Sequence, residues 1–321
     1  MPQPWHRNEQ RESDGTMKAL RVHDYAGPLR EEVVGDPQAA SGQVVVRVVA
    51  TSFNPIDPKR ASGRMREIMP LTFPWIPGGD VSGVVESVGA QVRDLAQGDE
   101  VFGYSMAGGA YAERIAVDGA ALAVKPRTIQ HEIAAAIGVV GQTATQTVST
   151  GRLRSGQTLL VHGGSGGVGS LAIQLAHALG VSVIATARAS QASALRGLGV
   201  DRVIDYTTER FEDSSGAIDV VFDFVGGDVQ QRSISLLKPG GILVATSQPP
   251  DPKRCALRGV EGSCCRRISS HGLAAFADKI VSGKIRPLIE RVESLWQPAT
   301  LWDERPAGAT LGKTIFMLNG I

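Results

Sequence analysis

The sequence predicts an α/β chain in which a doubly wound parallel sheet is inserted into a domain of short β-strands. Short apolar strands separated by Gly, Pro and Asp occupy residues 17–126, and strands then alternate with helical segments over residues 127–268. Such alternation is typical of a parallel sheet with helices on both faces. Two late strand-like segments are more similar to the first strands than to the alternating part. We therefore expect residues 269–321 to return to the first domain.

The bulk properties of the chain limit its possible functions. Its 321 residues suffice for about two domains, and its formal net charge is +1. Lysines and arginines are scattered, so a nucleic-acid-binding role is not indicated. No apolar run approaches the length of a transmembrane helix, and the N-terminus is polar throughout, so we expect no membrane partner. An odd count of three cysteines favours a reducing compartment, and we expect a cytoplasmic protein.

The first domain consists of short strands joined by turns. Residues 1–16 are polar and aperiodic, and we expect them to form a disordered tail. The first strand begins at Met17, and the later strands are expected at Gln43–Ala50, Val81–Val88, Glu100–Gly103 and Tyr111–Val117. Their regular spacing with glycine turns predicts a compact, partly closed β-barrel.

The second part of the chain contains the alternating elements. A helix is expected over Glu132–Val148, with an interruption at Gly138–Gly141. Five strands are expected, at Leu159–Val161, Val181–Thr186, Arg202–Ile204, Asp219–Val225 and Ile242–Thr246. The helices between them end near Gly180, Leu198 and Leu237. A last helix near Leu273–Ser282 is followed by strand-like segments at Arg286–Val292 and Lys313–Leu318.

A glycine-rich turn joins the first strand of the alternating part to its helix. Gly164, Gly166 and Gly169 fit the pattern G-x-G-x-x-G. In a dinucleotide-binding Rossmann domain one glycine makes the turn, one lets the backbone approach a pyrophosphate, and one lets the helix pack on the strand. The pyrophosphate binds at the helix N-terminus, where free N–H groups and the helix dipole favour an anion. The candidate cofactor-binding residues of this loop are Gly164, Ser165, Gly166, Gly167, Val168 and Gly169.

Two other interpretations of this loop are weaker. The phosphate loop of nucleotide triphosphatases, G-x-x-x-x-G-K-[ST], fits Gly164 and Gly169, but Ser170 stands where that loop needs lysine. A glycine turn can also simply join a strand to a helix. The strand–helix–strand pattern around the loop favours dinucleotide binding over both.

The residues after the second strand of the parallel sheet indicate which dinucleotide is bound. An NAD site usually has Asp or Glu about 20 residues past the glycines to bind the ribose 2′-hydroxyl. Here Thr186 and Arg188 stand at that strand end, and arginine offers a planar donor fork that suits a 2′-phosphate. We expect NADPH rather than NADH, with Ser190 completing the pocket and Tyr206 stacking on adenine. The alternatives are a solvated charge for Arg188 and a packing role for Tyr206.

Several motifs occur in order along the chain and are highly specific together. They are Asn54–Asp57, Pro77–Val85, Gly98–Gly103, Gly108–Glu113, Gly141–Ala144, Val203–Tyr206, Asp219–Gly227 and Leu311–Thr314. On these motifs the chain from Met17 to Ile321 resembles the zinc-independent medium-chain dehydrogenase/reductases, in particular their NADPH:quinone oxidoreductase-like branch. The resemblance implies a GroES-like catalytic domain, a Rossmann domain that binds NADPH, a cleft between them, and a homodimer.

The resemblance also implies that no metal is bound. Asn54 stands where the related alcohol dehydrogenases place a Cys ligand of zinc, and Gly79 stands where they place a His ligand. The four-cysteine structural zinc lobe is absent as well, because Cys255 is the first cysteine of the chain. Zinc requires several ligands of the Cys, His or carboxylate type together, whereas the histidines of this chain are isolated.

Without a metal, the substrate must itself accept hydride well, as quinones and α,β-unsaturated carbonyls do. The nicotinamide supplies the hydride, while the protein positions the reactants and stabilises the negative charge that develops on oxygen. The Asn54 amide is the candidate donor to that oxygen, although a turn role before proline is the alternative. Asp57 is expected to orient the loop or to hold Lys59 or Arg60.

The proton donor is harder to assign from the sequence. Met65 stands where the related mitochondrial-type enoyl reductases carry a tyrosine donor, so that assignment fails here. Tyr104 and Tyr111 are candidates, each with a packing role as the alternative. Solvent can also supply the proton to a quinone.

The remaining cofactor contacts come from the resemblance and from positions at strand ends. Thr143 matches the family residue near the nicotinamide, and Lys313 matches a family lysine at the cleft, with a solvated strand lysine as the alternative. Backbone contacts to the nicotinamide half are expected from Phe224, Val225, Gly226, Thr246 and Ser247. Leu295–Gly308 departs from the helical pattern common in the family, and its prolines limit any helix there to about one or two turns.

The leading hypothesis is an NADPH-dependent reductase of a small-molecule quinone or enone. An enoyl-thioester reductase, which performs the same chemistry on a carrier-linked substrate, is the second hypothesis. A catalytically silent NADPH-binding protein with a structural or partner-binding role is the third, and NADPH binding without turnover would select it.

Overall fold

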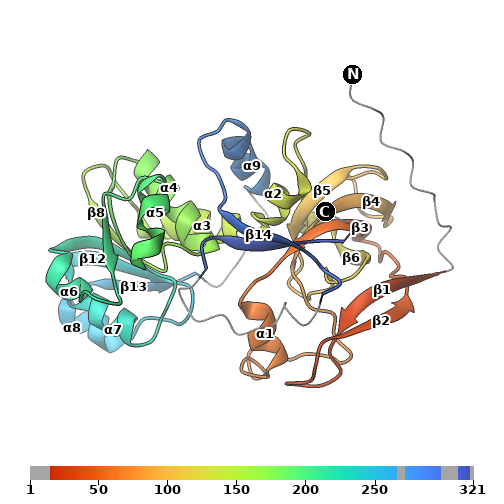
Figure 1. Ribbon diagram of the computed structural model, residues 1–321, viewed down its shortest axis with the longest axis horizontal. Coiled ribbons are helices and arrows are strands. Elements are labelled where there is room, and N and C mark those ends of the chain that lie inside the picture. The colour runs from red at the N-terminus through yellow and green to blue at the C-terminus, as the bar shows by residue number, and fades with distance from the viewer. Residues whose placement is uncertain (1–14, 266–271, 298–309, 319–321) are drawn as a thin grey trace.

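The computed structural model describes residues 15–265, 272–297 and 310–318. Two lobes lie side by side along the long axis of the molecule, and helix α3 (Gly138–Gly151) lies between them (Figure 1). Most of the expected tail at residues 1–16 lies outside the described residues, as does most of the departing segment at residues 295–308. The first strand begins at Thr16.

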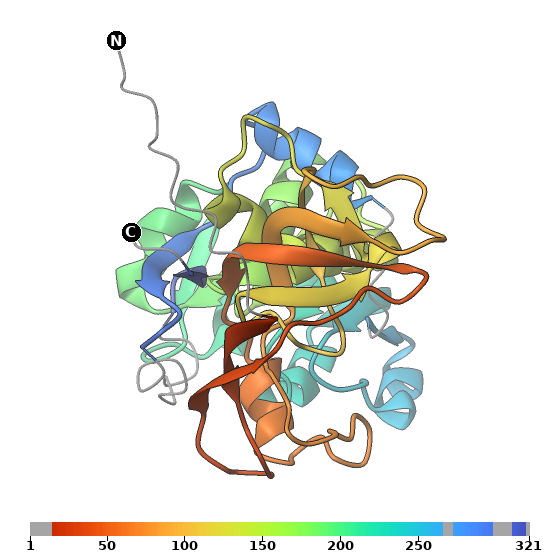
Figure 2. The same ribbon diagram turned by 90° about the vertical axis from the view of Figure 1, so that its right-hand side faces the viewer.

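The first lobe consists of a small sheet and a larger curved one. The small sheet pairs β1 (Thr16–Arg21) with β2 (Arg30–Gly35). The larger sheet has the order β14-β15-β3-β4-β5-β7, with β6 paired to β3, and Figure 2 shows its strands wrapping around an interior. Its strands are β3 (Gln43–Ser52), β4 (Asp80–Val88), β5 (Glu100–Tyr104), β6 (Arg114–Asp118), β7 (Leu122–Val124), β14 (Ile289–Ser294) and β15 (Lys313–Met317). Alternate valines of β3 and β4 fill this interior because successive side chains of a strand point to opposite faces.

The last strand of the chain returns to the first lobe. β15 pairs antiparallel with β3, with Phe316 opposite Thr51, and it pairs parallel with β14. This pairing makes the parallel-sheet part an insertion, as expected from the sequence. The limits of the insertion, at residues 126/127 and 268/269, stay a prediction, because α3 packs against elements of both lobes.

The second lobe contains a six-stranded parallel sheet with the order β10-β9-β8-β11-β12-β13. In chain order this is 3-2-1-4-5-6, the arrangement of dinucleotide-binding Rossmann domains. Its strands are β8 (Thr158–His162), β9 (Ser182–Ala187), β10 (Arg202–Asp205), β11 (Ile218–Asp223), β12 (Leu237–Ala245) and β13 (Glu261–Cys264). Its helices are α4 (Gly167–Ala178), α5 (Ala192–Arg196), α6 (Phe211–Ser214), α7 (Asp228–Ile234) and α8 (Pro252–Arg258). Both faces of the sheet are buried, which explains the nearly continuous apolar strands.

The interruption of the first long helix differs from the sequence expectation. The chain forms α2 (His131–Ala135) and then α3 from Gly138, so the break falls at Ala136 and Ile137 and not within the glycines. The cause is tertiary, because the carboxylate of Asp80 accepts a hydrogen bond of 2.7 Å from the backbone N–H of Val139. A side chain from a distant strand therefore sets the start of α3.

Other differences involve elements with weak local signals. The strand expected from Tyr111 begins at Arg114, because Tyr111 is held outside the large sheet by backbone hydrogen bonds to Leu20 and Pro77. β2 and β13 were not expected, and β13 has the sequence Glu-Gly-Ser-Cys, which lacks the β-branched residues typical of strands. Three short helical elements, α1 (Ile56–Ala61), η1 (Gly119–Ala121) and η2 (Ala189–Gln191), connect the strands, and α9 (Leu273–Val281) packs on α3.

In the part of the chain that the structure describes, no helix has both the length and the apolar character needed to cross a bilayer.

Two glycines at the start of α4 provide a matched test of how closely this helix packs on the turn after β8. A Cβ at position 169 would lie 2.3 Å from the carbonyl oxygen of Gly163, whereas a Cβ at position 166 would lie 3.5 Å from the same atom. We expect Gly169→Ala to lower the free energy of unfolding by about 1–3 kcal/mol and Gly166→Ala to change it by less than about 1 kcal/mol. Urea denaturation measures both, and equal losses would contradict the packing described here.

Candidate active site

The glycine loop lies at the carboxyl end of the parallel sheet, between β8 and α4. The chain turns at Gly163, whose φ of +75° is a left-handed conformation that favours glycine. The turn residue is thus one position before the expected motif. Gly169 faces the backbone of Gly163 and Gly164, so α4 packs directly on the loop. Gly166 is the N-cap residue of α4, and no side-chain cap hydrogen bond is made there.

This geometry suits a bound pyrophosphate. The first N–H groups of an α-helix have no partner within the helix, and in α4 no capping side chain competes for them. The free N–H groups and the helix dipole attract an anion at this end. The backbone of Gly166 and Gly167 is half-exposed, so a ligand can approach it closely. The loop residues therefore fit a dinucleotide on sterics and on charge.

A second loop lies across the crevice at the point where the strand order reverses. It follows β11, and the buried carboxylate of Asp223 organises it by accepting hydrogen bonds from the N–H groups of Val225 (2.9 Å) and Gly226 (2.8 Å). The side chain of Gln230 donates to the other oxygen of Asp223 at 3.0 Å. Phe224 is half-buried and Val225 is exposed, so this loop presents both to the crevice end of the sheet.

The loops after β11 and β12 meet at the same edge. A Cβ on Gly226 would lie 2.4 Å from Oγ of Ser247, which shows how closely they approach. Thr246 is half-buried and Ser247 is exposed. The structure therefore brings together the predicted residues of both loops.

The predicted adenosine end is also assembled by tertiary structure. Nε of Arg188 donates a hydrogen bond of 3.1 Å to the hydroxyl of Tyr206, although the two residues follow different strands. Ser190 is exposed next to them in η2. Asp205 lies in the same region, but its carboxylate accepts from the N–H of Ala189 at 3.1 Å and from Thr207 at 2.7 Å. These local bonds lower the pKa of Asp205 and fix the turns around the pocket.

Thr186 has a different environment from the one expected. Its side chain is buried, and its hydroxyl lies 3.0 Å from Nδ1 of His162, whose Nε2 lies 2.9 Å from Oγ of Ser233. Burial lowers the pKa of His162 to about 4, so the ring is neutral. The Thr186 hydroxyl is therefore occupied inside the sheet, where β9 pairs with β8 and β10.

The buried carboxylate of Asp80 is the centre of the site in the first lobe. One oxygen accepts hydrogen bonds from Oγ of Ser52 (2.5 Å), Nδ2 of Asn54 (2.8 Å) and Nζ of Lys313 (3.2 Å). The other oxygen accepts from the N–H of Val139 at the start of α3. This cluster is almost completely buried and joins β3, β4, α3 and β15.

Lys313 also interacts with residues other than Asp80. Its Nζ donates to the carbonyl oxygen of Phe53 and to Oδ1 of Asn54, both at 2.7 Å. With the bond to Asp80, the three N–H groups of the ammonium are all used. Its methylene groups lie against Gly167, where a Cβ would be 2.9 Å from Cδ of the lysine. The ammonium is thus held by the first lobe, which differs from the expected direct contact with a cofactor.

Asp57 lies in a second buried cluster below the same loop. The N–H of Gly78 donates to its carboxyl group, while Oδ2 has no hydrogen-bond partner. Burial and the nearby Asp80 raise the pKa of Asp57 to about 7. Arg60 does not pair with it closely, since its guanidinium donates to the carbonyl oxygen of Met106 and stacks over Trp75.

The two tyrosine candidates are packed under the same turn. Tyr111 is 1% exposed, it packs edge-on against Phe316, and its hydroxyl has no hydrogen-bond partner. Tyr104 is also buried, and burial raises the pKa of both phenols. A Cβ on Gly78 or on Gly79 would clash with these rings. The rings therefore support the Gly78–Gly79 turn, and the Tyr111 hydroxyl is buried.

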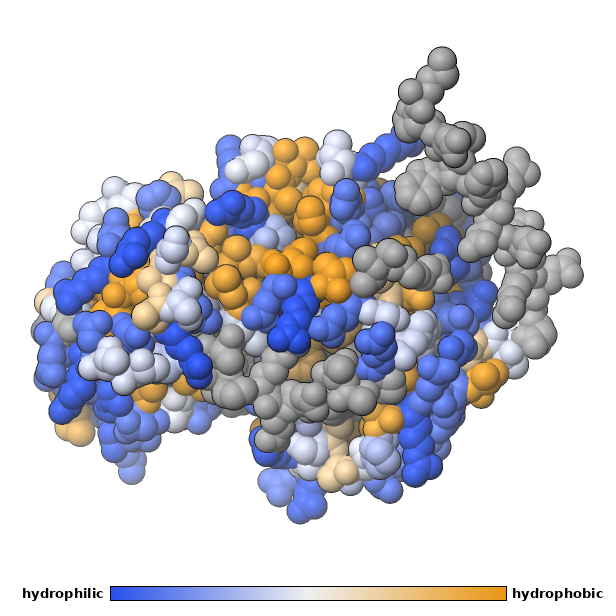
Figure 3. Space-filling model, in the orientation of Figure 1, coloured by the Kyte–Doolittle hydropathy of each residue, from blue (hydrophilic) through white to orange (hydrophobic). Residues whose placement is uncertain are grey.

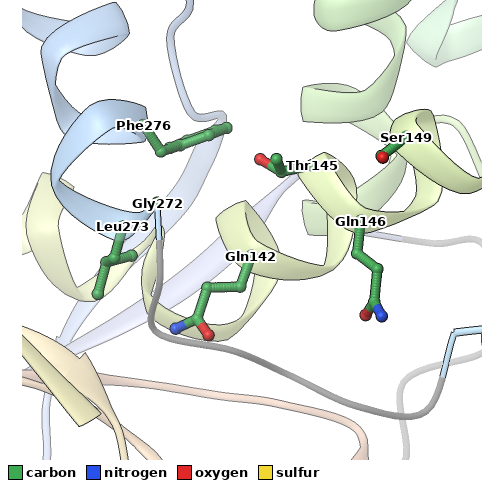
Figure 4. Close-up of a pocket in the computed structure, with 7 residues that line it drawn as sticks. All are labelled: Gln142, Thr145, Gln146, Ser149, Gly272, Leu273 and Phe276. Carbon is green, nitrogen blue, oxygen red and sulfur yellow. The ribbon is translucent and has the colours of Figure 1, made fainter. Parts of the chain in front are cut away.

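Thr143 lies on α3, half-buried, and its hydroxyl donates to the carbonyl oxygen of Val139 at 2.8 Å. A hollow of about 240 Å³ lies elsewhere on this helix, between α3 and α9 (Figure 4). It is lined by Gln142, Thr145, Gln146, Ser149, Gly272, Leu273 and Phe276. None of these belongs to the glycine loop or to the Asn54 loop, so the candidate cofactor-binding residues do not line this hollow.

Hydrophobic and hydrophilic residues occupy different parts of the molecular surface. Hydrophobic residues gather in the middle of the face seen in Figure 3, over α9 and β14, and hydrophilic residues cover much of both ends. Within residues 15–265, 272–297 and 310–318, no group of three or more His, Cys, Asp or Glu side chains is arranged to bind a metal ion.

Three residues of the site were not recognised as functional from the sequence. Asp80 and Asp223 both occur within the quoted motifs, and both are acids that directly follow or begin an apolar strand segment, which is a signal for a buried organising carboxylate. Gly312 was also missed; its N–H donates to the carbonyl oxygen of Ser165 at 2.7 Å and ties β15 to the glycine loop. No local signal identifies that contact.

Two protein-family models match the two lobes. The alcohol dehydrogenase GroES-like domain matches residues 40–127, and the zinc-binding dehydrogenase model matches residues 167–272. Among solved structures, the quinone oxidoreductase from Coxiella burnetii superposes with a TM-score of 0.87 at 28% identity, covering 95% of this chain and 100% of that one.

Sequence relatives cover most of the chain. A 2-methylene-furan-3-one reductase of Solanum lycopersicum is 36% identical over 85% of this chain and 71% of its own length. An NADPH-dependent alkenal/one oxidoreductase of Arabidopsis thaliana is 37% identical over 85% of this chain and 72% of its own. A quinone oxidoreductase of Mus musculus is 32% identical over 71% of this chain and 72% of its own length. Relatives this similar over this much of both chains establish the family: the protein belongs to the quinone oxidoreductase-like branch of the medium-chain dehydrogenase/reductases and is an oxidoreductase.

Proposed function

We propose that the protein transfers hydride from NADPH to a quinone or an α,β-unsaturated carbonyl without a metal ion. The proximity of Arg188 to Tyr206, at the same sheet edge as the uncapped glycine loop, is the observation that carries the NADPH part. The names of the relatives, which include an NADPH-dependent alkenal/one oxidoreductase and a quinone oxidoreductase, support the acceptor class.

Each part of the cofactor would have its own contacts. The N–H groups at the start of α4 would hold the pyrophosphate, and the Arg188 guanidinium would bind the 2′-phosphate. The Tyr206 ring would stack on the adenine. The loops at Phe224–Gly226 and Thr246–Ser247, together with Thr143, would hold the nicotinamide half. When bound, NADPH supplies a hydride from nicotinamide C4.

The Asn54 amide would stabilise the charge that develops on the substrate oxygen. Its Nδ2 uses one N–H for Asp80, its Oδ1 accepts from Lys313, and the second N–H of Nδ2 makes no hydrogen bond to the described residues. A donor held in advance by a buried network requires little reorganisation during the reaction. Asp57 would act from behind the loop by holding the N–H of Gly78.

An enoyl-thioester substrate is the alternative acceptor. The chain is 34% identical over 286 residues to part of the spectinabilin polyketide synthase system protein NorB of Streptomyces orinoci, spanning 13% of that protein. A catalytically silent NADPH-binding protein is the remaining alternative. For the assembly we propose a homodimer through the edges of the Rossmann domains, where β13 is one of the two edge strands of the sheet. For the compartment we propose the cytoplasm, which is consistent with three free cysteines.

The deciding experiment is a titration with NADPH and NADH by fluorescence, followed by turnover with 1,4-benzoquinone, an alkenone and an enoyl thioester. We expect NADPH to bind more tightly than NADH and to be oxidised when the quinone or the enone is added. Oxidation with the thioester alone would select the alternative acceptor. Binding without any turnover would select the silent protein, and no nucleotide binding would refute the proposal.

The choice of nucleotide can be tested at Arg188. Arg188→Ala should raise the dissociation constant of NADPH about 10- to 100-fold, because a charge-assisted hydrogen bond contributes about 1.5–3 kcal/mol. The affinity for NADH should change little. Arg196→Ala, which removes an exposed arginine of the neighbouring helix α5, is the control. An equal loss for both nucleotides would show that Arg188 does not recognise the 2′-phosphate.

The Gly166→Ala variant also tests where the pyrophosphate binds. Gly166→Ala, which we expect to fold normally, should weaken the binding of both NADPH and NADH by about 10-fold or more, because a methyl group would occupy the space needed by the pyrophosphate. Isothermal titration of each nucleotide measures this. Unchanged affinity would place the pyrophosphate elsewhere.

The buried Asp57 predicts a pH dependence of stability. Its pKa is about 7 in the folded protein against 3.8 in an unfolded chain, so the unfolded state loses its proton first as the pH rises. The contribution of protonated Asp57 to the free energy of unfolding is therefore fully present below about pH 4, and it is lost as the pH rises to about 7. Asp57→Asn removes this pH-dependent contribution. The free energy of unfolding of the variant minus that of the wild type should therefore rise between pH 4 and pH 8, by up to about 4 kcal/mol. Parallel pH profiles of the two proteins would contradict the assignment.

A further inference from the structure

We propose that Lys313 is a positioning residue that, with Gly312, couples the glycine loop to the orientation of the Asn54 amide. The inference deepens the proposed function, because it concerns how the nucleotide site and the substrate-polarising residue act together. It assigns Lys313 no direct contact with a phosphate.

The connection to the glycine loop is made by the backbone. The N–H of Gly312 donates to the carbonyl oxygen of Ser165 at 2.7 Å, and Gly312 forms a parallel β-bridge with Gly166. Gly312 has a φ of +91°, and a Cβ there would lie 2.1 Å from the carbonyl oxygen of Leu288. Only glycine fits this position. Its hydrogen bond and bridge therefore hold the residue before β15 in contact with the loop that would receive the pyrophosphate.

The connection to the substrate side is made by the next side chain. Lys313 is 5% exposed and its three donors are all used, by Phe53, Asn54 and Asp80. An ammonium has donors only, so it must face an oxygen. It therefore faces Oδ1 of Asn54, and the carboxylate of Asp80 receives Nδ2. The two charged groups together fix which way the amide points, and they thereby fix the direction of its remaining N–H.

The two connections are joined by the lysine chain itself. Its methylene groups lie against Gly167, the first residue of α4, and its Nζ reaches Asn54 in the other lobe. A shift of the glycine loop on binding an anion would move Gly312 and the packed lysine chain, and with them the amide. By reciprocity, an oriented Asn54 favours the loop conformation that binds nucleotide.

Hydrogen exchange tests this coupling without relying on turnover. We expect saturating NADP⁺ to slow amide exchange in residues 52–57 of the wild-type protein. In Lys313→Met, which keeps most of the chain length but removes the ammonium, that protection should be lost while protection of the glycine loop itself persists. Lys238→Met, which removes an exposed lysine paired with Asp219, is the control and should behave as wild type. Persisting protection of residues 52–57 in Lys313→Met would overturn the proposal.

Kinetics provide the second measurement. Lys313→Met should lower kcat about 10- to 100-fold, a smaller effect than complete loss of one oxyanion donor. The dissociation constant of NADPH should change less than about 3-fold, whereas a direct phosphate contact would weaken it about 10-fold or more. In the Asn54→Ala background Lys313→Met should have little further effect on kcat, because no amide remains to be oriented. Additive losses would indicate a structural role only and would overturn the proposal.

Two outcomes must be separated. If the wild-type protein binds NADPH but reduces no acceptor, the proposed function fails while the exchange experiment still decides the coupling. If Lys313→Met does not fold, the double variant Asp80→Asn/Lys313→Met replaces it, since removing both charges of a buried pair is better tolerated than removing one. The double variant should also lose the protection of residues 52–57, and retention would overturn the proposal.

Discussion

The site depends on one buried carboxylate. Asp80 is completely buried, and a charge in that position is tolerated only when donors surround it. Donors from Ser52, Asn54, Val139 and Lys313 meet this requirement, and they come from three separate segments of the chain. The need to satisfy a single charge therefore sets where α3 begins, how the Asn54 amide points, and where β15 docks on the first lobe.

Because α3 and β15 also contact the Rossmann domain, the same requirement joins the two lobes. α3 packs against α4, and Gly312, the residue directly before β15, is bonded to the glycine loop. The nucleotide site and the Asn54 loop thus share their supports. Under the proposed function, this arrangement would hold the Asn54 amide as a preorganised donor, which suits acceptors such as quinones and enones that need only moderate activation.

Local patterns were sufficient to predict much of the fold. The parallel sheet, the insertion and the glycine loop followed from strand–helix alternation and from glycine spacing, and the structure has all three. Arg188 and Tyr206 were predicted to lie in one pocket at the ends of two strands, and the structure brings them within hydrogen-bond distance. By contrast, Thr186 and Lys313 were expected to face the cofactor, but their polar atoms are used by buried partners, which a strand-end position does not reveal.

The sequence by itself determined the class of most elements, although not of β2 and β13, and the chemistry available at the strand ends, because periodicity and glycine positions act over a few residues. Only the tertiary structure decided which polar groups are left for a ligand. The break before α3 and the triple contact of Lys313 arise from residues 59 to 260 positions apart in the chain. Such contacts follow from the need to pair every buried donor and charge, and that requirement is met by the whole fold and not by any local segment.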